Sequence, residues 1–329
     1  MTAPLVTRKT PADTAAIEAA VRCLASGGLV AFPTETVYGL GADATNGEAV
    51  ARLYAAKGRP AFNPLIAHVV DRAAAQVLAR FDADAARLAA AFWPGPLTLV
   101  LPKAAGCPVA ELATAGLDSI AVRVPHHAVA QKILAGFARP VVAPSANRSG
   151  HVSPTTAEHV LADLGGRIDF IVDGGPTPVD VESTIIACLG EPVLLRPGGV
   201  PRDAIERALL QPLADPPAGF AAMDDAPLAP GMLASHYAPH TPLRLDADRI
   251  EASEALLAFG PKLADGAERA ARVLNLSERA DLIEAAANLF SHLRALDAAG
   301  AKCIAVMPIP RGDLGEAIND RLARAASPR

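Results

Sequence analysis

Short apolar runs alternate with stretches of helical periodicity along almost the whole chain, and this alternation constrains the fold most strongly. Residues 29–32, 97–101 and 141–143 are apolar runs of the length expected of buried strands. Residues 14–26 and 48–56 instead repeat apolar side chains at the spacing of a helix that packs on one face. Strands and helices that alternate in this way predict an α/β protein.

Composition supports a globular protein and limits its partners. The chain has 329 residues, of which 51% are hydrophobic and 20% charged, and the mean hydropathy is +0.26. These values exclude bulk disorder, and the length suits two domains. The net charge of −5 argues against a broad basic surface that binds nucleic acid, although a local basic cleft stays possible.

The four cysteines, Cys23, Cys107, Cys188 and Cys303, lie far apart and form no Cys-x-x-Cys pair. We therefore predict buried thiols in a reducing compartment, with neither a zinc site nor a disulfide framework. No apolar run reaches membrane-spanning length, and the N-terminus carries no apolar segment of the secretory type. The sequence thus predicts a cytoplasmic protein that has no membrane partner.

A proline-rich stretch divides the chain. Prolines recur through residues 212–240 with small residues between them, which predicts a semi-rigid linker. Within it, segment 230–239 (PGMLASHYAP) carries more functional groups than a spacer needs, and Tyr237 is its aromatic residue. We predict a first domain over residues 1–211 and, after the linker, a smaller α/β domain over residues 241–329.

The polar residues of the first domain gather where its predicted strands end. Thr34 and Thr36 follow one strand, and Ser145, Asn147 and Ser149 follow another. Ligands commonly bind at such loops in α/β folds, where hydroxyls and amides donate to phosphate oxygens and Ser or Asn oxygens also suit Mg²⁺. Each loop alone is equally consistent with an ordinary turn. Together they predict a nucleotide site.

Lys57 and Arg59 are the cations expected at this site. Gly58 and Pro60 both disfavour a helix, so we predict an extended segment in which positions two apart point the same way. The two side chains would then aim together at an oligophosphate. A solvated basic turn remains the alternative from this segment alone.

Established nucleotide, metal and hydrolase motifs are absent. The chain has no Gly-x-x-x-x-Gly-Lys-Ser/Thr, no full dinucleotide fingerprint, no His-Glu-x-x-His and no Gly-x-Ser-x-Gly. His126 and His127 are adjacent, so their side chains diverge and a surface position is expected. His68, at a strand end beside the Lys57 loop, is the better candidate, with a buried structural histidine as the alternative.

Four segments resemble the YrdC-like family of L-threonylcarbamoyladenylate synthases. They are 33–41 (PTETVYGLG), 57–65 (KGRPAFNPL), 144–150 (PSANRSG) and 181–185 (VESTI). Segment 230–239 and the added C-terminal domain look like the long, two-domain form of that family. The resemblance implies a twisted mixed sheet flanked by helices in the first domain, and a Rossmann-like α/β second domain.

The resemblance also implies a nucleotidyltransferase reaction. L-threonine, bicarbonate and ATP would give threonylcarbamoyl-AMP and pyrophosphate, with Mg²⁺ accompanying ATP. The product would pass to the machinery that forms N6-threonylcarbamoyladenosine at position 37 of tRNA, and a weak direct contact with tRNA is left open.

By motif position, the residues expected to bind ATP are Lys57, Arg59, Asn63, Ser119, Ser145, Asn147, Ser153, Arg196 and Tyr237. Those expected to bind L-threonine are Thr36, His68, Arg123, Ala143 and Ser183. Lys57 and Arg59 are the expected catalytic residues because they would hold the triphosphate, and Arg123 would bind the threonine carboxylate. No metal is expected to be held by protein residues alone. Tyr237 would make the linker a lid over the nucleotide.

One position departs from the family, and other function classes stay open. Asp180 stands before Val181 where the family usually has glycine; aspartate tolerates some left-handed geometry but brings a charge close to the predicted threonine site. A non-catalytic RNA-binding module is the alternative function, although the acidic net charge and few aromatics count against it. A hydrogenase-maturation type of carbamoyltransferase would need cysteine-rich zinc modules, and a degenerate binding domain would not need intact polar loops.

Overall fold

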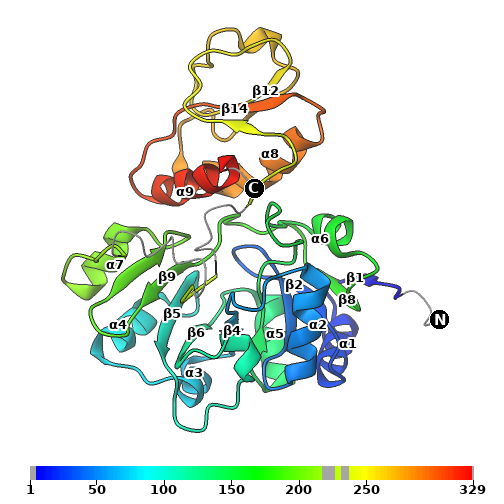
Figure 1. Cartoon of the computed structure of the whole chain (residues 1–329), viewed down its shortest axis with the longest axis vertical. Coiled ribbons are helices and arrows are strands. Elements are labelled where there is room, and N and C mark those ends of the chain that lie inside the picture. Colours follow the sequence, from blue (N-terminus) through cyan, green and yellow to red (C-terminus); the bar gives the residue numbers. More distant parts are fainter. Residues whose placement is uncertain (1–4, 217–226, 231–236, 328–329) are drawn as a thin grey trace.

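The computed structural model of the chain describes residues 5–216, 227–230 and 237–327. These residues form one sheet of ten strands and a second sheet of four (Figure 1). In the large sheet some neighbours are antiparallel, as in the pairs β2–β3 and β5–β6, and others are parallel, as in β4–β6. The predicted α/β class, with a mixed sheet and a second smaller α/β unit, is therefore confirmed.

The strands of the large sheet follow a spatial order that differs from their order along the chain. That order is β1 (Arg8–Pro11), β8 (Phe170–Asp173), β2 (Val30–Pro33), β3 (Tyr38–Asp43), β7 (Val141–Val142), β4 (Ile66–His68), β6 (Ser119–Arg123), β5 (Leu97–Pro102), β9 (Thr184–Ala187) and β10 (Val193–Arg196). The helices that accompany it are α1 (Thr14–Ala25), α2 (Gly47–Lys57), α3 (Arg72–Leu78), α4 (Ala83–Phe92), α5 (Ala128–Phe137), α6 (Ala157–Leu164) and α7 (Arg202–Leu209), with the 3₁₀ helix η1 (Glu111–Thr114).

The two faces of this sheet are covered differently, and the difference makes room for a site. Val30 and Phe32 pack against α1 and α5, whereas Ala31 between them faces the core that α2, α3, α4, α6 and α7 share. On the α1–α5 face, the part of the sheet around β4, β6 and β9 instead carries a smaller cluster that includes Ile66 and Ala229. Side chains on this part of the face therefore meet loops and the linker segment 227–230.

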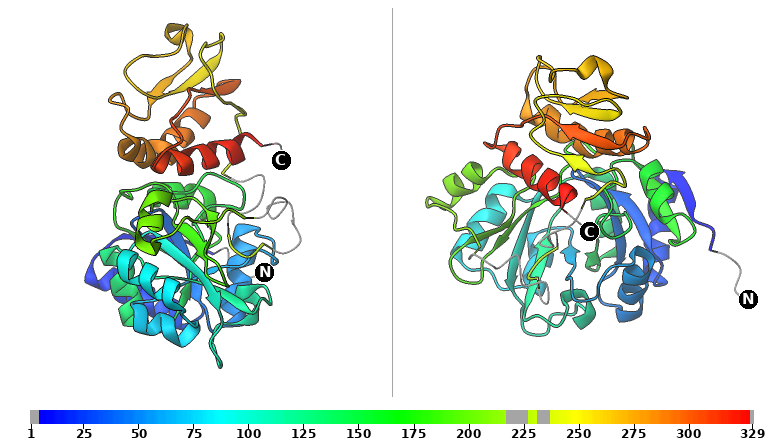
Figure 2. Two further views of the ribbon diagram at one scale, coloured as in Figure 1. Left: turned by 90° about the vertical axis from the view of Figure 1, so that its left-hand side faces the viewer. Right: turned by 45° about the horizontal axis from the view of Figure 1, so that its top comes forward.

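The small sheet is parallel throughout. Its order is β11 (Leu243–Arg244), β14 (Cys303–Val306), β12 (Glu254–Ala258) and β13 (Val273–Asn275), and it is accompanied by α8 (Leu282–Asp297), α9 (Leu314–Ala326) and the 3₁₀ helix η3 (Ala267–Arg269). Both long helices lie between the small sheet and the first domain (Figure 1). The turned views in Figure 2 show α9 lying against the first domain.

A hydrophobic core joins the two domains. Val37, Val152 and Val181 of the first domain belong to the same buried cluster as Phe290 and the other apolar residues of α8 and α9. Tyr237, at the end of the linker, stacks on Phe290 with ring centroids 5.7 Å apart. The C-terminal domain is therefore packed against the first domain through apolar contacts as well as through polar ones.

One local prediction was wrong, and two strands were not predicted. Lys57 ends α2, and Gly58 takes the left-handed conformation with a φ of 61°, so the Lys57–Arg59 stretch is not extended. The strand β3 was not predicted, although Tyr38–Asp43 pairs with β2 in an antiparallel hairpin just after the Thr34–Thr36 turn. The strand β1 was not predicted, since Arg8–Pro11 is polar and sits at the edge of the sheet beside β8.

The predicted boundaries of the linker stay a prediction, because residues 217–226 and 231–236 lie outside the described residues. The second of these ranges covers most of segment 230–239. In the parts of the chain that the structure does describe, we find no helix that is both long and apolar enough to cross a membrane.

Candidate functional site

A polar cavity opens on the face of the large sheet that α1 and α5 leave uncovered. Its walls come from β4, β6 and β10, from the loops around β2, β7 and β9, and from the linker. The lining residues are Thr36, Val37, Arg59, Ile66, His68, Arg123, Ala143, Pro144, Ser145, Glu182, Ser183, Arg196, Pro230 and Tyr237. Most of the predicted site residues are among them, so segments far apart in sequence meet at one place.

Three cations of this site, Arg59, Arg196 and Lys57, bond to backbone carbonyls and to a hydroxyl, and no carboxylate of the described residues is in direct contact with them. Arg59 donates to the carbonyls of Asn63 and Pro64, at 3.2 and 3.0 Å, and Arg196 donates to the Ser183 carbonyl at 2.8 Å. Lys57 lies behind the wall and donates to the carbonyls of Ser145 and Asn147. Buried positive charge without a partner carboxylate favours an anionic ligand.

Burial changes the acidity of these cations. It lowers the pKa of Arg59 to about 10, so this guanidinium remains charged at neutral pH. The pKa of Lys57 is lowered well below its ordinary value by burial and then by the charge of Arg59. An anion bound beside them would favour the charged forms again.

Arg123 is held by a carboxylate that the sequence analysis did not single out. Its guanidinium donates to Glu35 at 2.7 Å and to the Thr36 hydroxyl at 3.0 Å, and both Arg123 and Glu35 are buried. The other oxygen of Glu35 accepts from the backbone N–H of His126 at 3.0 Å. Glu35 therefore fixes the direction in which Arg123 faces the cavity.

His68 faces the cavity as a neutral ring. Burial, followed by the charge of Arg123, lowers the pKa of His68 to about 3. Its Nδ1 lies 3.1 Å from the carbonyl oxygen of Ile66, which only accepts, so Nδ1 carries the proton. Nε2 is then left as an acceptor for a hydroxyl or ammonium group of a ligand.

Ser183 is held at the cavity wall by two further polar groups. Its hydroxyl lies 2.7 Å from that of Thr98, and Arg196 donates to it at 3.2 Å. The chain crosses closely behind it, because a Cβ added to Gly198 would lie 2.3 Å from the Glu182 carbonyl oxygen. Only glycine fits at position 198 while this loop keeps its course.

Glu182 brings negative charge to the cavity wall and is tied to the C-terminal domain. It accepts from the Ser153 hydroxyl at 2.6 Å and from Arg321 of α9 at 2.7 Å. Although burial disfavours its charged form, Arg321 and Arg196 hold the pKa of Glu182 below its ordinary range. Glu182 is therefore ionised within a ring of donors.

The remaining predicted ATP residues do not line the cavity. Ser119 shares a face of β6 with Arg123, but the two lie four positions apart along the strand, which corresponds to roughly 13 Å. Ser153 is turned toward Glu182. The backbone carbonyl of Asn63 accepts from Arg59, and both polar atoms of the Asn63 side chain are buried without a hydrogen-bond partner, as is the Asn147 amide oxygen. Unpaired buried amides are unfavourable in a folded protein, which marks this region as one built to receive polar groups.

Sequence reasoning missed Glu35, Thr98, Glu182 and Arg321. Glu35 and Glu182 lie within the quoted segments 33–41 and 181–185, so a search for a carboxylate near the paired cations would have found them. Thr98 and Arg321 carry no such signal, because only the folding of the sheet and of α9 places them here.

Asp180 takes the left-handed conformation that glycine favours, with a φ of 53°. Its carboxylate accepts from the Thr177 hydroxyl at 2.6 Å, and Asp180 is not one of the residues that line the cavity. The backbone at this point thus has the geometry that a glycine would have, and the added carboxyl group bonds within its own loop.

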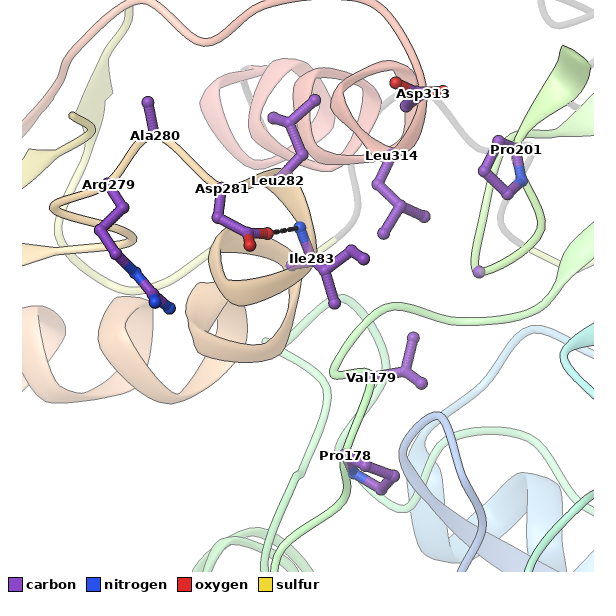
Figure 3. A pocket seen from close by; sticks show the side chains of 12 residues that line it. Pro178, Val179, Pro201, Arg279, Ala280, Asp281, Leu282, Ile283, Asp313 and Leu314 are labelled. Carbon is purple, nitrogen blue, oxygen red and sulfur yellow. Dashed lines mark hydrogen bonds between the residues drawn. The ribbon is translucent and has the colours of Figure 1, made fainter.

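A larger hollow of about 790 Å³ lies at another part of the domain junction. Figure 3 shows it between the starts of α8 and α9 and the loops that carry Val179 and Pro201. The Asp281 carboxylate beside it caps α8 by accepting from the N–H of Ile283 at 2.7 Å. None of the predicted site residues lines this hollow, so its size does not locate the functional site.

Comparison with known proteins agrees with the chemistry of the smaller cavity. Residues 22–198 match a family described as telomere recombination, and residues 200–327 match the C-terminal domain of threonylcarbamoyl-AMP synthase. A Pyrococcus abyssi protein named threonylcarbamoyl-AMP synthase is 43% identical over 95% of this chain and 94% of its own length. The chain belongs to the threonylcarbamoyl-AMP synthase family. Another member, from Bacillus subtilis, is 41% identical over 92% of this chain and 90% of its own length.

One solved structure is similar to this chain over both domains. The crystal structure of Pyrococcus abyssi Sua5 complexed with L-threonine superposes with a TM-score of 0.87 at 38% identity, covering 98% of this chain and 97% of that one. The family resemblance read from the sequence is therefore confirmed, together with the fold that it implied.

Proposed function

We propose that this chain makes threonylcarbamoyl-AMP and pyrophosphate from L-threonine, bicarbonate and ATP, as a member of its family. The observation that carries the proposal is the buried group of Arg59, Arg196 and Lys57, whose direct contacts are carbonyls and hydroxyls, next to a pocket of hydroxyls and a neutral histidine. A triphosphate would pair with the cations, and an amino acid would occupy the adjoining polar pocket.

On the nucleotide side, Arg59 and Arg196 face the cavity and Lys57 stands behind it. We assign the triphosphate to Arg59 and Lys57, and we assign the unpaired side-chain amide of Asn63 to a polar group of ATP. Ser145 completes this side. Ser119 and Ser153 would need a change of local geometry, or a water molecule, to touch the nucleotide.

On the amino-acid side, we assign the threonine carboxylate to Arg123, which Glu35 holds in position. Thr36, Ser183 and the neutral ring of His68 would receive the ammonium and hydroxyl groups. The backbone of Ala143 closes the pocket between them.

The chemistry needs positioning more than a strong base. Threonine and bicarbonate form a carbamate anion with loss of water, and one of the carbamate oxygens would attack the α-phosphorus of ATP. A new P–O bond forms while the bond from the α-phosphorus to the bridging oxygen breaks, and pyrophosphate leaves. Fixed cations that hold the phosphates lower the repulsion between the two anions.

Mg²⁺ would accompany the triphosphate and offset part of its charge. Among the residues described by the structure, no group of three or more His, Cys, Asp and Glu is placed to hold a metal ion by itself. The unpaired amide oxygen of Asn147 is the kind of hard ligand that Mg²⁺ accepts. We therefore assign the ion to the nucleotide, with Asn147 as the nearest protein ligand.

Tyr237 is well placed to act as part of a lid. The cavity has a volume of about 50 Å³, far below the ~300 Å³ or more that a nucleotide-sized ligand fills. ATP therefore needs the wall that carries Tyr237 to move outward, and its return would shield the mixed anhydride from water. The product would then pass to the enzymes that modify adenosine 37 of tRNA in the cytoplasm, with at most a weak tRNA contact of its own.

Incubation with labelled bicarbonate, L-threonine and ATP tests this function. Pyrophosphate and a labelled threonylcarbamoyl-adenylate should appear together, and only when all three substrates are present. Arg59→Ala should lower the rate at least a hundredfold, because the triphosphate loses a buried charged ligand. Arg52→Ala, which removes a half-exposed cation of α2 paired with Asp169, should keep the wild-type rate. An Arg59→Ala variant of full activity would contradict the assignment of the phosphate ligands.

A further inference from the structure

Arg321 is the largest fully buried side chain of the described residues, and it reaches the cavity wall from the C-terminal domain. It donates to Glu182 at 2.7 Å and to the carbonyl of Pro197 at 2.9 Å. Its guanidinium carbon also lies 5.1 Å from the centre of the Tyr237 ring. One side chain of α9 thus touches three segments that surround the cavity, two of them, at Glu182 and Tyr237, on its wall.

The charges around Glu182 show what this contact does. Glu182 is the one carboxylate that lines the cavity among the described residues. Its direct ion-pair partner is Arg321, and Arg196 lies near without an ion pair to it. Asp320 also pairs with Arg321, but Arg324 bonds to the same carboxylate at 3.0 Å. With Arg321 in place, the charges of Arg59 and Arg196 are left for an anionic ligand.

We propose that Arg321 is a positioning residue of this site, by which the C-terminal domain neutralises Glu182 and holds Tyr237 against the cavity. The proposal rests on the proposed function in one respect, because it takes the ligand of the cavity to be a triphosphate. Without Arg321, the Glu182 carboxylate would lie beside the phosphates without an ion-pair partner, and its repulsion of the phosphates would weaken the binding of ATP. The second domain then completes the nucleotide site without touching the nucleotide.

Lysine would not replace Arg321. A single ammonium could pair with Glu182, but it has no planar fork to bond at the same time to the Pro197 carbonyl and to lie over the Tyr237 ring. Arg321→Lys is therefore expected to keep the charge and lose the geometry, which separates the two parts of the role.

The test measures affinity for a non-hydrolysable ATP analogue by calorimetry in full-length variants, each checked for folding by circular dichroism. Arg321→Met should bind the analogue at least tenfold more weakly than wild type. The affinity of Arg321→Lys for the analogue should lie between those of wild type and Arg321→Met. The double variant Glu182→Gln/Arg321→Met has neither charge but still lacks the contacts to Pro197 and Tyr237, so its affinity should recover from that of Arg321→Met to about that of Arg321→Lys.

Glu316→Gln is the matched control. Glu316 of α9 pairs with Arg202 across the same domain junction at 2.8 Å, and neither residue lines the cavity. Loss of this ion pair in Glu316→Gln should leave the affinity for the ATP analogue within twofold of wild type. If Arg321 only docked the two domains, Arg321→Met and Glu316→Gln should lower the affinity for the ATP analogue to the same extent. Adding Glu182→Gln to Arg321→Met should then not restore the affinity.

The outcomes separate this inference from the proposed function. Wild-type affinity in Arg321→Met, or a double variant as weak as Arg321→Met, would overturn the positioning role while leaving product formation intact. If Arg321→Met does not fold, wild-type affinity in Arg321→Lys would overturn it too. A wild-type protein that forms no threonylcarbamoyl-AMP would count against the proposed function, whichever way the variants bind.

Discussion

Asp180 shows how one residue can keep a backbone geometry and change the electrostatics of a loop. Its φ of 53° is tolerable for aspartate, the residue is 3% exposed, and its carboxyl group bonds to Thr177. Burial raises the pKa of Asp180 to about 7, against the opposing hydrogen bonds from Thr177 and Thr155. The sequence showed only that an aspartate stands where the family usually has glycine, and the folded loop shows that it keeps the left-handed backbone and is buried.

Asp180→Asn should change how stability depends on pH. The unfolded chain loses this proton near pH 3.8 and the folded chain near pH 7, so the folded state binds more protons in between. The free energy of unfolding of wild type should therefore fall, relative to the Asn variant, as pH rises through this window. The difference should approach zero near pH 4 and reach on the order of 2–4 kcal/mol at pH 8.

Urea unfolding of both proteins at several pH values measures this difference, and Thr177→Val serves as a control for loss of the hydrogen bond alone. A difference between wild type and Asp180→Asn that stays constant with pH would show that Asp180 is ionised throughout.

At the scale of elements, the end of α2 decides where the two cations point. Asn46 caps the start of the helix by accepting from the N–H groups of Glu48 and Ala49. Gly58 ends it in the left-handed conformation, which turns the chain so that Arg59 faces the cavity while Lys57 stays behind. The predicted extended segment failed because Gly58 also suits a helix C-cap, a role that local sequence does not distinguish from a loop.

Gly58→Ala should destabilise the protein by about 1–2 kcal/mol, because alanine disfavours a φ of 61°. A Cβ at this position would meet no atom within 4 Å, so the effect is one of backbone conformation and not of crowding. Gly58→Asn should lower the free energy of unfolding by less than Gly58→Ala does, since asparagine tolerates the left-handed region. Thermal and urea unfolding would compare the three proteins, and equal losses in both variants would contradict this explanation.

For the whole molecule, the decisive feature is the apolar core that the two domains share. Phe290 of α8 is fully buried and packs with Val37, Val152 and Val181 of the first domain in one cluster. On the other side of β12, residues such as Ile250 form a separate cluster inside the C-terminal domain. The domains should therefore unfold together, with the nucleotide site sensitive to the shared core.

Phe290→Ala should lower the free energy of unfolding by about 3–5 kcal/mol and weaken binding of the ATP analogue, because Tyr237 loses its stacking partner. Ile250→Ala should destabilise the C-terminal domain by about 2–5 kcal/mol without changing affinity. Denaturation followed by fluorescence of Trp93, in the first domain, gives the first quantity and calorimetry the second. Equal affinities in the two variants would contradict the coupling of this core to the site.

The sequence by itself determined the α/β class, the family, and most of the polar residues around the cavity, because periodicity and short motifs are local properties. His68, Arg123 and Ser183 could be placed in one site from their motifs. Only the tertiary structure decided which cations of the site have no carboxylate partner, and which carboxylates pair with the remaining cations. Glu35 and Arg123 are 88 residues apart, and Glu182 and Arg321 are 139 apart. Such pairs form only when the sheet and α9 bring them together, and their strength depends on a burial that no local pattern records.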